Sequence, residues 1–551
     1  MRGHATRQAA RLLCTSAALA ITVEAQVDMR QSWQKLDADP QVLVNSQGLA
    51  RHDLSIQGGS YAGSGMSING LRLKSPYSAH LNAELPILGN LLAAPTIGTG
   101  LDNVSGHLVG TANFNTQSFD QNQAAYAGAG NKEHYAAGTY GSSDMAGGFI
   151  DFENAREIDF QGNDLERFSG GVFLQIPHEE WTFDILTAGQ SKEFGAEGYY
   201  FNGVAGAADA EQQVDDNLLF AGATRGDLDD AYIRASALYR DIRNQYAAPS
   251  SLLFSDIYSK NAAVMIEGRT LEVQHIALNL RGDIEYDRVT GTITDNDRTR
   301  GSVLILPEAR FERFTLKAGV NSVFQTSESA DFLPMAGIDW FVSDNGRVFL
   351  SYSETEQQPD FQTLENNPLL QQQQSKNTEL GFKQFLSESC DWHIGTFFRT
   401  LENANDWVGG TATDLGRLNI SGLDTSISFY PSENLKLKAF YQWVYKDNDL
   451  ENGLYETDYP EHMLNLSAYW YFLDQFALQF SQTTRFQAEN AVRTSNDFGA
   501  LATLGLHYDP TFAQNVRLSF LVDNLWGSDF QSVPGLKPRP STIFAGLALN
   551  W

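Results

Sequence analysis

The sequence of 551 residues predicts an all-β membrane protein, built as a closed antiparallel transmembrane β-barrel. A secretory signal stands at the N-terminus, and apolar residues alternate with period two through most of the chain after residue 120. The last strand of this kind ends on an aromatic residue at the chain terminus. Helical periodicity is nearly absent after residue 120, and no apolar run reaches the roughly 18 residues that a membrane-spanning helix needs.

The charge composition disfavours several classes of function. The chain has 38 Lys and Arg against 67 Asp and Glu, which gives a formal charge of −29. An acidic protein is an unlikely partner for nucleic acid, because phosphate backbones demand basic surfaces. The 10 His show no metal-ligand spacing, and we find neither a nucleophile motif nor a paired-carboxylate signature. An enzyme is therefore disfavoured.

Residues 1–25 are predicted to form a signal peptide that is removed. Arginines precede an apolar stretch from Leu12 to Val23, and the small-residue pattern that follows suits cleavage before Gln26. Cys14 lies in the removed segment, so Cys390 remains alone. No disulfide within the mature chain is then possible, although an exported compartment would permit one.

Strands with one apolar face follow from the alternation. From Leu435 to Lys446 one parity is mostly apolar and the other is largely polar, which is the pattern of a half-buried strand. Residues 464–480 repeat it around a short turn at 473–475, which predicts a hairpin. Similar alternation occurs at residues 181–185, 348–352 and 516–520.

The final strand favours a barrel over a soluble sheet. A soluble edge strand with a continuous apolar stripe would be prone to aggregation. Pairing with the first barrel strand would satisfy its backbone groups and turn the stripe toward lipid, with Leu547 facing lipid and Ala548 facing the lumen. A buried strand of a soluble protein is the alternative. The predicted barrel-assembly signal consists of Ile543, Leu547, Leu549 and Trp551.

The length of the chain is compatible with a large barrel. Residues 121–551 would supply 22 strands with about 20 residues each, of which roughly 10 would cross the membrane. Sixteen strands would fit only with much longer loops. This arithmetic permits 22 strands without establishing them.

A family resemblance begins at residue 53. The stretches 53–59 (Asp-Leu-Ser-Ile-Gln-Gly-Gly), 66–71 (Met-Ser-Ile-Asn-Gly-Leu) and 106–116 resemble the plug domain of TonB-dependent outer-membrane receptors. Glycines in this region allow tight turns between short strands, which suits a small domain folded inside a lumen. The plug-motif residues are Asp53, Ser55, Gly58, Gly59, Asn69 and Gly70. Further echoes of the family, in its usual order, lie at residues 194–200, 359–369, 379–383 and 522–525.

This resemblance implies a 22-stranded barrel over residues 121–551, with an α+β plug domain over residues 26–120 in its lumen. It also implies a receptor in the outer membrane of a Gram-negative-type bacterium, inserted by the barrel-assembly machinery among outer-membrane lipid. Its ligand would be a scarce, bulky nutrient, such as a ferric siderophore, a cobalamin-like compound or an oligosaccharide. Import would use energy from TonB or an equivalent complex.

The front of the plug departs from the family pattern. About thirty residues separate Gln26 from Ile56, so the plug looks shortened, and we find no clear copy of the usual TonB-binding segment. Residues 41–44 (Gln-Val-Leu-Val) are either an atypical TonB-binding segment or, as we favour, the first plug strand. Gln57 stands where the family often has Arg.

Ligand-binding candidates are aromatic and polar residues in predicted loops, which could stack on a siderophore, a corrinoid or a sugar. Ordinary interface aromatics or loop packing are the alternative interpretation. The candidates are Tyr61, Tyr77 and His80 in or beside plug loops, and Tyr199, Tyr200, Phe201 and Asn202 in a predicted extracellular loop.

Acidic stretches could supply oxygen ligands to calcium in extracellular loops. They lie at residues 215–217, 227–230 and 295–297, and none has the spacing of an EF-hand. Solvated acidic loops are the favoured interpretation, and no other cofactor is predicted.

Three functions remain open at this point. The favoured one is a plugged receptor that imports a nutrient. A passive porin-like channel with a reduced plug is the second, and a soluble secreted β-protein, such as a sugar-binding module or a hydrolase, is the third.

Overall fold

The computed structural model describes residues 34, 36, 39, 41–47, 50–81, 84–117, 123–143, 145–156, 164–197, 209–228, 230–292, 294–326, 329–448 and 450–550. The predicted signal peptide lies outside these residues, as do Tyr199, Tyr200, Phe201, Asn202 and Trp551. Within the described residues, no helix is long and apolar enough to cross a membrane.

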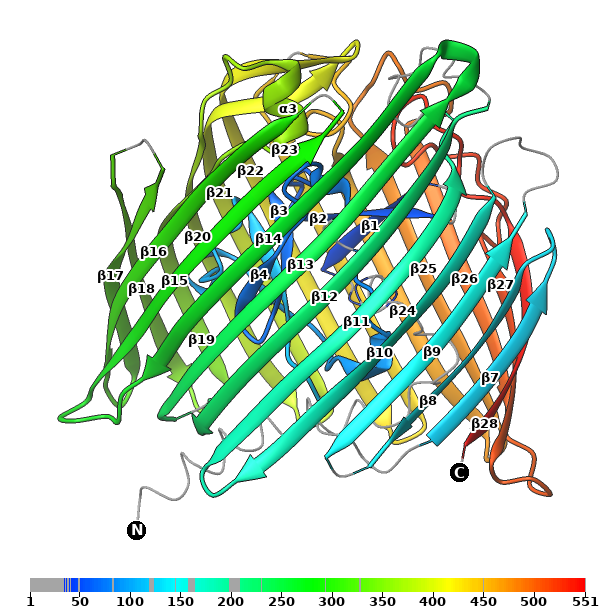
Figure 1. The fold of residues 1–551 in the computed structure, drawn as a ribbon. Helices are drawn as coiled ribbons and strands as arrows, with labels where there is room; N and C mark the ends of the chain where they lie inside the picture. Colours follow the sequence, from blue (N-terminus) through cyan, green and yellow to red (C-terminus); the bar gives the residue numbers. More distant parts are fainter. Residues whose placement is uncertain are drawn as a thin grey trace.

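Over these described residues, 22 strands form a closed barrel in which each strand pairs antiparallel with the next along the chain (Figure 1). The barrel closes where β28 (Thr542–Asn550) pairs with β7 (Gln123–Gly130), with Leu547 opposite Ala127. The predicted barrel and its strand number are therefore confirmed. The other strands are β8 (Tyr135–Ser142), β9 (Ala146–Ala155), β10 (Leu165–His178), β11 (Trp181–Gly195), β12 (Glu211–Gly226), β13 (Tyr232–Ala248), β14 (Leu253–Arg269), β15 (Ile276–Gly291), β16 (Asp295–Arg310), β17 (Phe314–Gln325), β18 (Asp331–Ser343), β19 (Gly346–Gln357), β20 (Gln373–Ser387), β21 (Cys390–Val408), β22 (Thr411–Ser432), β23 (Leu435–Lys446), β24 (Pro460–Leu473), β25 (Phe476–Gln487), β26 (Phe498–Tyr508) and β27 (Val516–Asp523).

The two ends of the barrel carry different connections. At one end, where β7 starts and β28 finishes, hairpins are joined by short turns such as residues 474–475 between β24 and β25. The opposite end carries the longer connections, including residues 358–372, 447–459 and 524–541. We call these the turn end and the loop end. The connection at 358–372 contains the short helix α3 (Phe361–Asn366).

The outer face of the barrel is apolar, as the alternation predicts. On β28, Leu547 is 38% exposed and points outward, whereas Ala548 is 2% exposed and points inward. Because a lipid-facing surface must be apolar along its whole girth, this alternation suits a membrane-spanning barrel. Exposed aromatic side chains mark both ends of this face, with Trp340, Trp470 and Phe472 toward the turn end and Trp443, Tyr445, Phe486 and Phe498 toward the loop end.

The plug, which we define as described residues 41–117, lies inside the barrel (Figure 1). Its first sheet pairs β1 (Val42–Gln47) with β2 (Arg51–Ile56), so residues 42–44 belong to the first plug strand, as favoured. A second sheet has the order β4-β3-β6-β5, in which β3 and β6 run parallel. Its strands are β3 (Ser64–Ile68), β4 (Leu71–Leu73), β5 (Thr96–Gly98) and β6 (Gly110–Phe114), and the plug also has the single-turn 3-10 helices η1 (Ala79–Leu81), η2 (Gly89–Leu91) and η3 (Gly100–Asp102).

Two glycines of the plug motif occupy turns that require a left-handed backbone. Gly58 has φ 70° and Gly70 has φ 84°, conformations that a side chain would strain. Ser55 Oγ donates to Gly59 O at 2.7 Å, and Asn69 Nδ2 donates to Thr116 Oγ1 at 2.9 Å. These motif residues therefore hold the turns of the plug in place.

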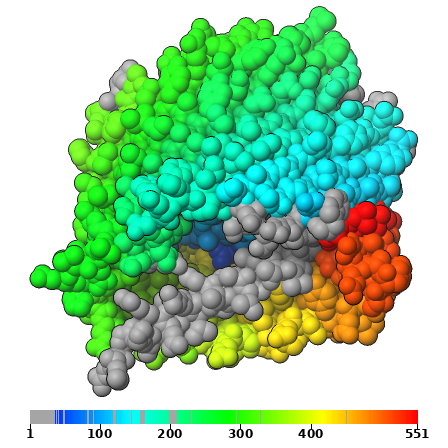
Figure 2. All heavy atoms as spheres, turned by 60° about the horizontal axis from the view of Figure 1, so that its bottom comes forward, coloured from blue at the N-terminus to red at the C-terminus, as the bar shows by residue number. Residues whose placement is uncertain are grey.

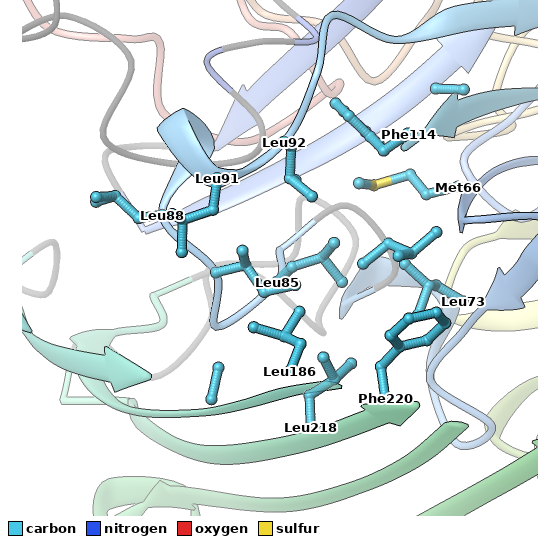
Figure 3. Close-up of a cluster of buried hydrophobic side chains, with 14 of the residues drawn as sticks. Met66, Leu73, Leu85, Leu88, Leu91, Leu92, Phe114, Leu186, Leu218 and Phe220 are labelled. Atoms are coloured by element: carbon cyan, nitrogen blue, oxygen red, sulfur yellow. The ribbon is translucent and has the colours of Figure 1, made fainter. Parts of the chain in front are cut away.

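The apolar core of the plug continues into the barrel wall. Figure 3 shows plug side chains such as Leu85 and Phe114 together with Leu186 of β11 and Phe220 of β12 in one cluster. The cluster also includes Phe173 on β10. The apolar core of the plug thus continues without a break into the wall formed by β7 to β14.

Candidate functional site at the plug apex

Three rings gather at the end of the plug that faces the barrel loops. The rings of Tyr61 and His80 stack with centroids 3.7 Å apart, and Tyr455 meets them edge-on at 4.7 and 5.1 Å. His80 Nδ1 lies 3.0 Å from Asp53 Oδ2, on the neighbouring strand β2. We call Asp53, Tyr61, His80 and Tyr455 the apical cluster. It brings two of the predicted candidates together with a loop residue that the sequence did not indicate.

Barrel loops cover the apical cluster. Tyr61 is 8% exposed and His80 is 6% exposed, because the connection at 447–459 folds inward over them. That connection is fixed by Arg493, whose Nη2 donates to Asp458 Oδ1 at 2.7 Å. A ligand that stacks on the cluster must therefore displace Tyr455 first.

Tyr77 lies apart from the apical cluster. It is buried with Ile257, Val289 and Phe361, and the last of these belongs to α3. The carbonyl of Tyr77 accepts from the backbone N–H of Gln362 at 3.0 Å. Tyr77 thus joins the plug to a loop-end helix, and packing explains its burial without a ligand.

Ion pairs attach one side of the plug to the barrel. Lys74 Nζ lies 2.7 Å from both Glu285 Oε1 and Asp287 Oδ2 on β15, and Arg72 Nη2 lies 3.1 Å from Glu285 Oε2. Lys192 on β11 pairs with Glu84 of the plug. Burial would raise the pKa of Glu84, but Lys192 and then His52 outweigh it and lower this pKa to about 2.

Further inward-facing arginines bind plug backbone and amide oxygens. Arg240 donates to the carbonyl of Glu84 at 2.9 Å, and Arg281 donates to the carbonyl of Gly70 at 2.8 Å. Arg399 donates to Gln57 Oε1 at 2.6 Å, so the amide of this chain accepts a bond that an Arg at this position could not. Sequence reasoning missed these residues. Basic side chains at the alternate strand positions that face the lumen would have indicated them.

Acid should weaken the plug, because its buried histidines are neutral in the folded state. Burial, reinforced by the cation of Arg72, lowers the pKa of His107 to about 3, and burial with Arg51 lowers that of His80 to about 4. Between pH 6.5 and these lowered pKa values, the unfolded plug binds more protons than the folded plug. The free energy of unfolding therefore falls as the pH drops, by roughly 1.4 kcal/mol per pH unit for each histidine.

His107→Gln should remove the contribution of one histidine to this pH dependence of plug stability. The amide of Gln can still donate to the carbonyl of Met66, which lies 3.3 Å from His107 Nε2, but it does not titrate. Pulse proteolysis of the plug in urea at pH 7 and pH 5 measures the difference. Equal pH dependence of the variant and the wild type would show that His107 is not neutral in the plug.

The described residues of the acidic stretches lie in strands or in a turn at the turn end rather than in loop-end connections. Residues 215–217 belong to β12 rather than to a loop, and Asp216 pairs with Arg240 across the lumenal face. Residues 295–297 begin β16, and Asp227 and Asp230 sit in a turn at the turn end. Because side chains alternate along a strand, neighbouring carboxylates there diverge. Across the described part of the chain, no three His, Cys, Asp or Glu side chains gather so as to hold a metal ion.

Comparisons with known proteins agree with this geometry. Similar solved structures include the FrpB iron transporter from Neisseria meningitidis, with a TM-score of 0.74 and 11% identity over 96% of this chain and 98% of that chain. The copper transporter OprC has a TM-score of 0.74 and 13% identity over 96% of each chain. The ferric preacinetobactin receptor BauA from Acinetobacter baumannii has a TM-score of 0.72 and 13% identity over 95% of this chain and 94% of that chain. At such identities the likeness shows the fold alone.

A sequence comparison with curated proteins gives no match. The family model described as "TonB dependent receptor-like, beta-barrel" matches residues 94–525. This family and the similar structures are receptors and transporters rather than enzymes. The chain therefore belongs to the TonB-dependent receptor-like β-barrel family.

Proposed function

We propose that the protein is a receptor of the Gram-negative outer membrane that binds a scarce, bulky nutrient at the apical cluster and imports it into the periplasm. Energy for import comes from TonB or an equivalent complex. The observation that carries this proposal is the placement of the cluster between the loop-end connections and the plug, which occupies the lumen.

Energy is required because, among the residues that the structure describes, the plug leaves little free space between itself and the wall. A cavity between the plug and the wall measures about 140 Å³, well below the roughly 300 Å³ or more of pockets that hold small ligands. A nutrient can pass only if the plug moves. A passive porin-like channel, the alternative function, would need a lumen that is open at rest.

The ligand classes that we propose follow from the apical rings. Tyr61, His80 and Tyr455 offer ring faces, and burial lowers the pKa of His80 to about 4, so its ring is neutral near pH 7 and Asp53 supplies the carboxylate of the cluster. Such a site suits a catecholate-bearing ferric siderophore, a cobalamin-like ring system or an oligosaccharide, each of which has flat faces that stack on aromatic side chains.

Tyr61→Ala should weaken binding of the cognate nutrient about tenfold, which corresponds to roughly 1.4 kcal/mol, a typical value for one aromatic contact. Binding is measured on whole cells with a panel of radiolabelled ferric siderophores, cobalamin and oligosaccharides. Tyr135→Ala is the matched control, because Tyr135 is a loop-end tyrosine, 52% exposed, outside the cluster. Equal affinity of the two variants would place the ligand elsewhere.

Import itself is tested by uptake of the same panel in cells with and without TonB. Uptake that depends on TonB is expected. The porin alternative is tested separately, by recording KCl currents of the full-length protein in planar bilayers. Large steady currents without any perturbation would contradict the receptor and support the open channel.

A further inference from the structure

A cavity separates the plug from one side of the barrel. It lies between plug residues such as Gln57 and Thr99 and the wall formed by β17 to β23, and it measures about 140 Å³. Arg347, Lys383 and His393 line it, and each stands near the turn end of its strand. Figure 2 views this end and shows a hollow in which the blue residues of the plug are visible. We call this space the wall cavity.

The side of the plug that faces β9 to β15 is held firmly. The ion pairs of Arg72 and Lys74 with Glu285, and of Glu84 with Lys192, join it to β15 and β11. The apolar core of the plug also continues into Leu186 of β11 and Leu218 and Phe220 of β12, as Figure 3 shows. Buried ion pairs are costly to separate because each leaves uncompensated charge, so this side resists displacement.

Beside the wall cavity the polar contacts between the plug and the wall are weaker. Thr99 Oγ1 donates to Glu379 Oε2 at 3.1 Å, and Arg399 donates to Gln57 at 2.6 Å. In each of these bonds one partner is a neutral group. Toward the loop end, Leu108 and Val109 pack on β21 to β23 in an apolar cluster that includes Phe397, which also lines the cavity. This apolar contact carries no ion pair among the residues that the structure describes.

The lining of the wall cavity is polar and carries both charges. Lys317, Arg347 and Lys383 supply cations. Asp339, Glu379 and Asp424 supply carboxylates, and Arg347 pairs with Asp339 at 3.2 Å. Apolar side chains such as Leu101 and Phe349 also line the cavity, but the charged groups supply hydrogen bonds that favour a hydrophilic solute.

We propose that the imported ligand leaves through the wall cavity, between the plug and β17 to β23, while the plug stays anchored to β11 and β15. The ligand is a hydrophilic solute rich in hydroxyl, amide or carboxylate groups. This inference rests on the proposed function, since it supplies the path of the same import. Displacement begins at β5 and η3 and breaks the apolar contact of Leu108 and Val109 with β21 to β23, and the cavity widens into a passage.

The order of release is tested without any ligand, by hydrogen exchange of the full-length protein in detergent micelles with rising urea. Amides of Thr96–Asp102, beside the cavity, are expected to exchange at least tenfold faster than those of Leu71–Leu73 at the same low urea concentration. Lys74→Met should reduce the difference, because it removes an anchor from β4. Simultaneous exchange of the two segments in the wild type, or earlier exchange of Leu71–Leu73, would overturn the proposal.

The path is tested by filling the cavity. Gly395 lines it, and the three atoms nearest to a Cβ there belong to the side chains of His393 and Asp424, at 3.2 Å or more, so we choose Gly395→Trp. Gly222→Trp is the matched control. Gly222 lies on β12 and faces the lumen, and the atoms nearest to a Cβ there belong to Phe220 at 3.0 Å and Ser236 at 3.6 Å. The probe is KCl current in planar bilayers, at the urea concentration that first opens Thr96–Asp102.

Gly395→Trp is expected to reduce this current at least fivefold, and Gly222→Trp to leave it within twofold of the wild type. Equal effects of the two variants would refute the wall cavity as the path. Ser351→Phe, which also lines the cavity, replaces Gly395→Trp if that variant fails to insert. Uptake that depends on TonB but is unaffected by Gly395→Trp would refute the path and leave the receptor function standing, whereas a missing uptake would refute the function and leave the order of plug release measurable.

Discussion

Leu547→Lys is expected to prevent most of the protein from assembling in the outer membrane. Leu547 lies in the middle of β28, points outward and pairs with Ala127 on one side and Leu518 on the other. A lysine on the lipid face of a barrel costs about 2 to 4 kcal/mol near the midplane of the bilayer. A loss of this size in the strand that closes the barrel should shift most molecules to the unassembled state. The measurement is the fraction that keeps the compact electrophoretic mobility of a folded barrel in unheated detergent gels.

The controls use neighbouring positions on the same strand. Leu549→Lys, closer to the turn end, should cost less, because the penalty falls toward the interface. A charge at Ala548 is not a mild lumenal change, as its facing alone would indicate, because Ala548 is 2% exposed and packs on Tyr126. Ala548→Ser is therefore the better inward control. Assembly of Leu547→Lys at the wild-type level would show that this face does not meet lipid.

Glu285→Ala is expected to release the plug from the wall while leaving the barrel folded. Glu285 is 4% exposed and holds Arg72 at 3.1 Å and Lys74 at 2.7 Å, and it also accepts from Asn261 at 2.9 Å. Removing one partner of a buried ion pair typically costs about 3 to 5 kcal/mol, because uncompensated charge stays buried. Lys74 keeps Asp287, so Arg72 carries most of the loss. The urea midpoint of plug release, followed by pulse proteolysis, reports the change.

An exposed ion pair supplies the control for this prediction. Glu180 pairs with Arg225 in the turn end of the barrel, with side chains 71% and 53% exposed. Surface pairs contribute about 0 to 1 kcal/mol, so Glu180→Ala should leave the midpoint of plug release almost unchanged. A similar midpoint for Glu285→Ala and Glu180→Ala would mean that the β15 ion pairs do not anchor the plug.

The barrel could be predicted from the sequence because its signal is local. The stripe of Ile543, Leu547 and Leu549 and the strand from Leu435 to Lys446 repeat every second residue, and the structure reproduces both. Closure of the sheet follows from the same strands, since an unpaired apolar edge cannot face water or lipid. Tight turns at Gly58 and Gly70 could also be predicted, because glycine permits them, and the structure gives both residues a positive φ.

The apical cluster could be predicted only in part, because it joins distant segments. Tyr61 and His80 were indicated by their place in plug loops, but Tyr455 comes from a barrel connection almost four hundred residues later. Tyr77 was chosen by the same reasoning and proves to be packed against α3, since burial is invisible in a loop pattern. The lumenal arginines were missed because every second residue of a barrel strand points inward and is polar in the sequence. This pattern is the same whether the side chain contacts water or the plug.

The acidic residues 215–217 were misread for a related reason. Three polar residues in a row favour a loop by local pattern. In β12, Asp216 instead points into the lumen and pairs with Arg240, whereas Asp215 points outward and accepts from Ser191. The strand continues through these residues on the loop-end side of its apolar outer face. Barrel strands that extend beyond the membrane lose the apolar parity that makes them recognisable.

The antiparallel pairing of β1 with β2 has a mechanical consequence. Val42 lies opposite Ile56 at the open end of this hairpin, and Gln47 lies opposite Arg51 beside its bend. A pull on the chain ahead of Val42 would therefore separate the paired residues of β1 and β2 one pair after another, from Val42 toward Gln47. It would not load all of their hydrogen bonds at the same time. The hairpin should therefore open under a smaller force than a pair of strands whose hydrogen bonds are all loaded together.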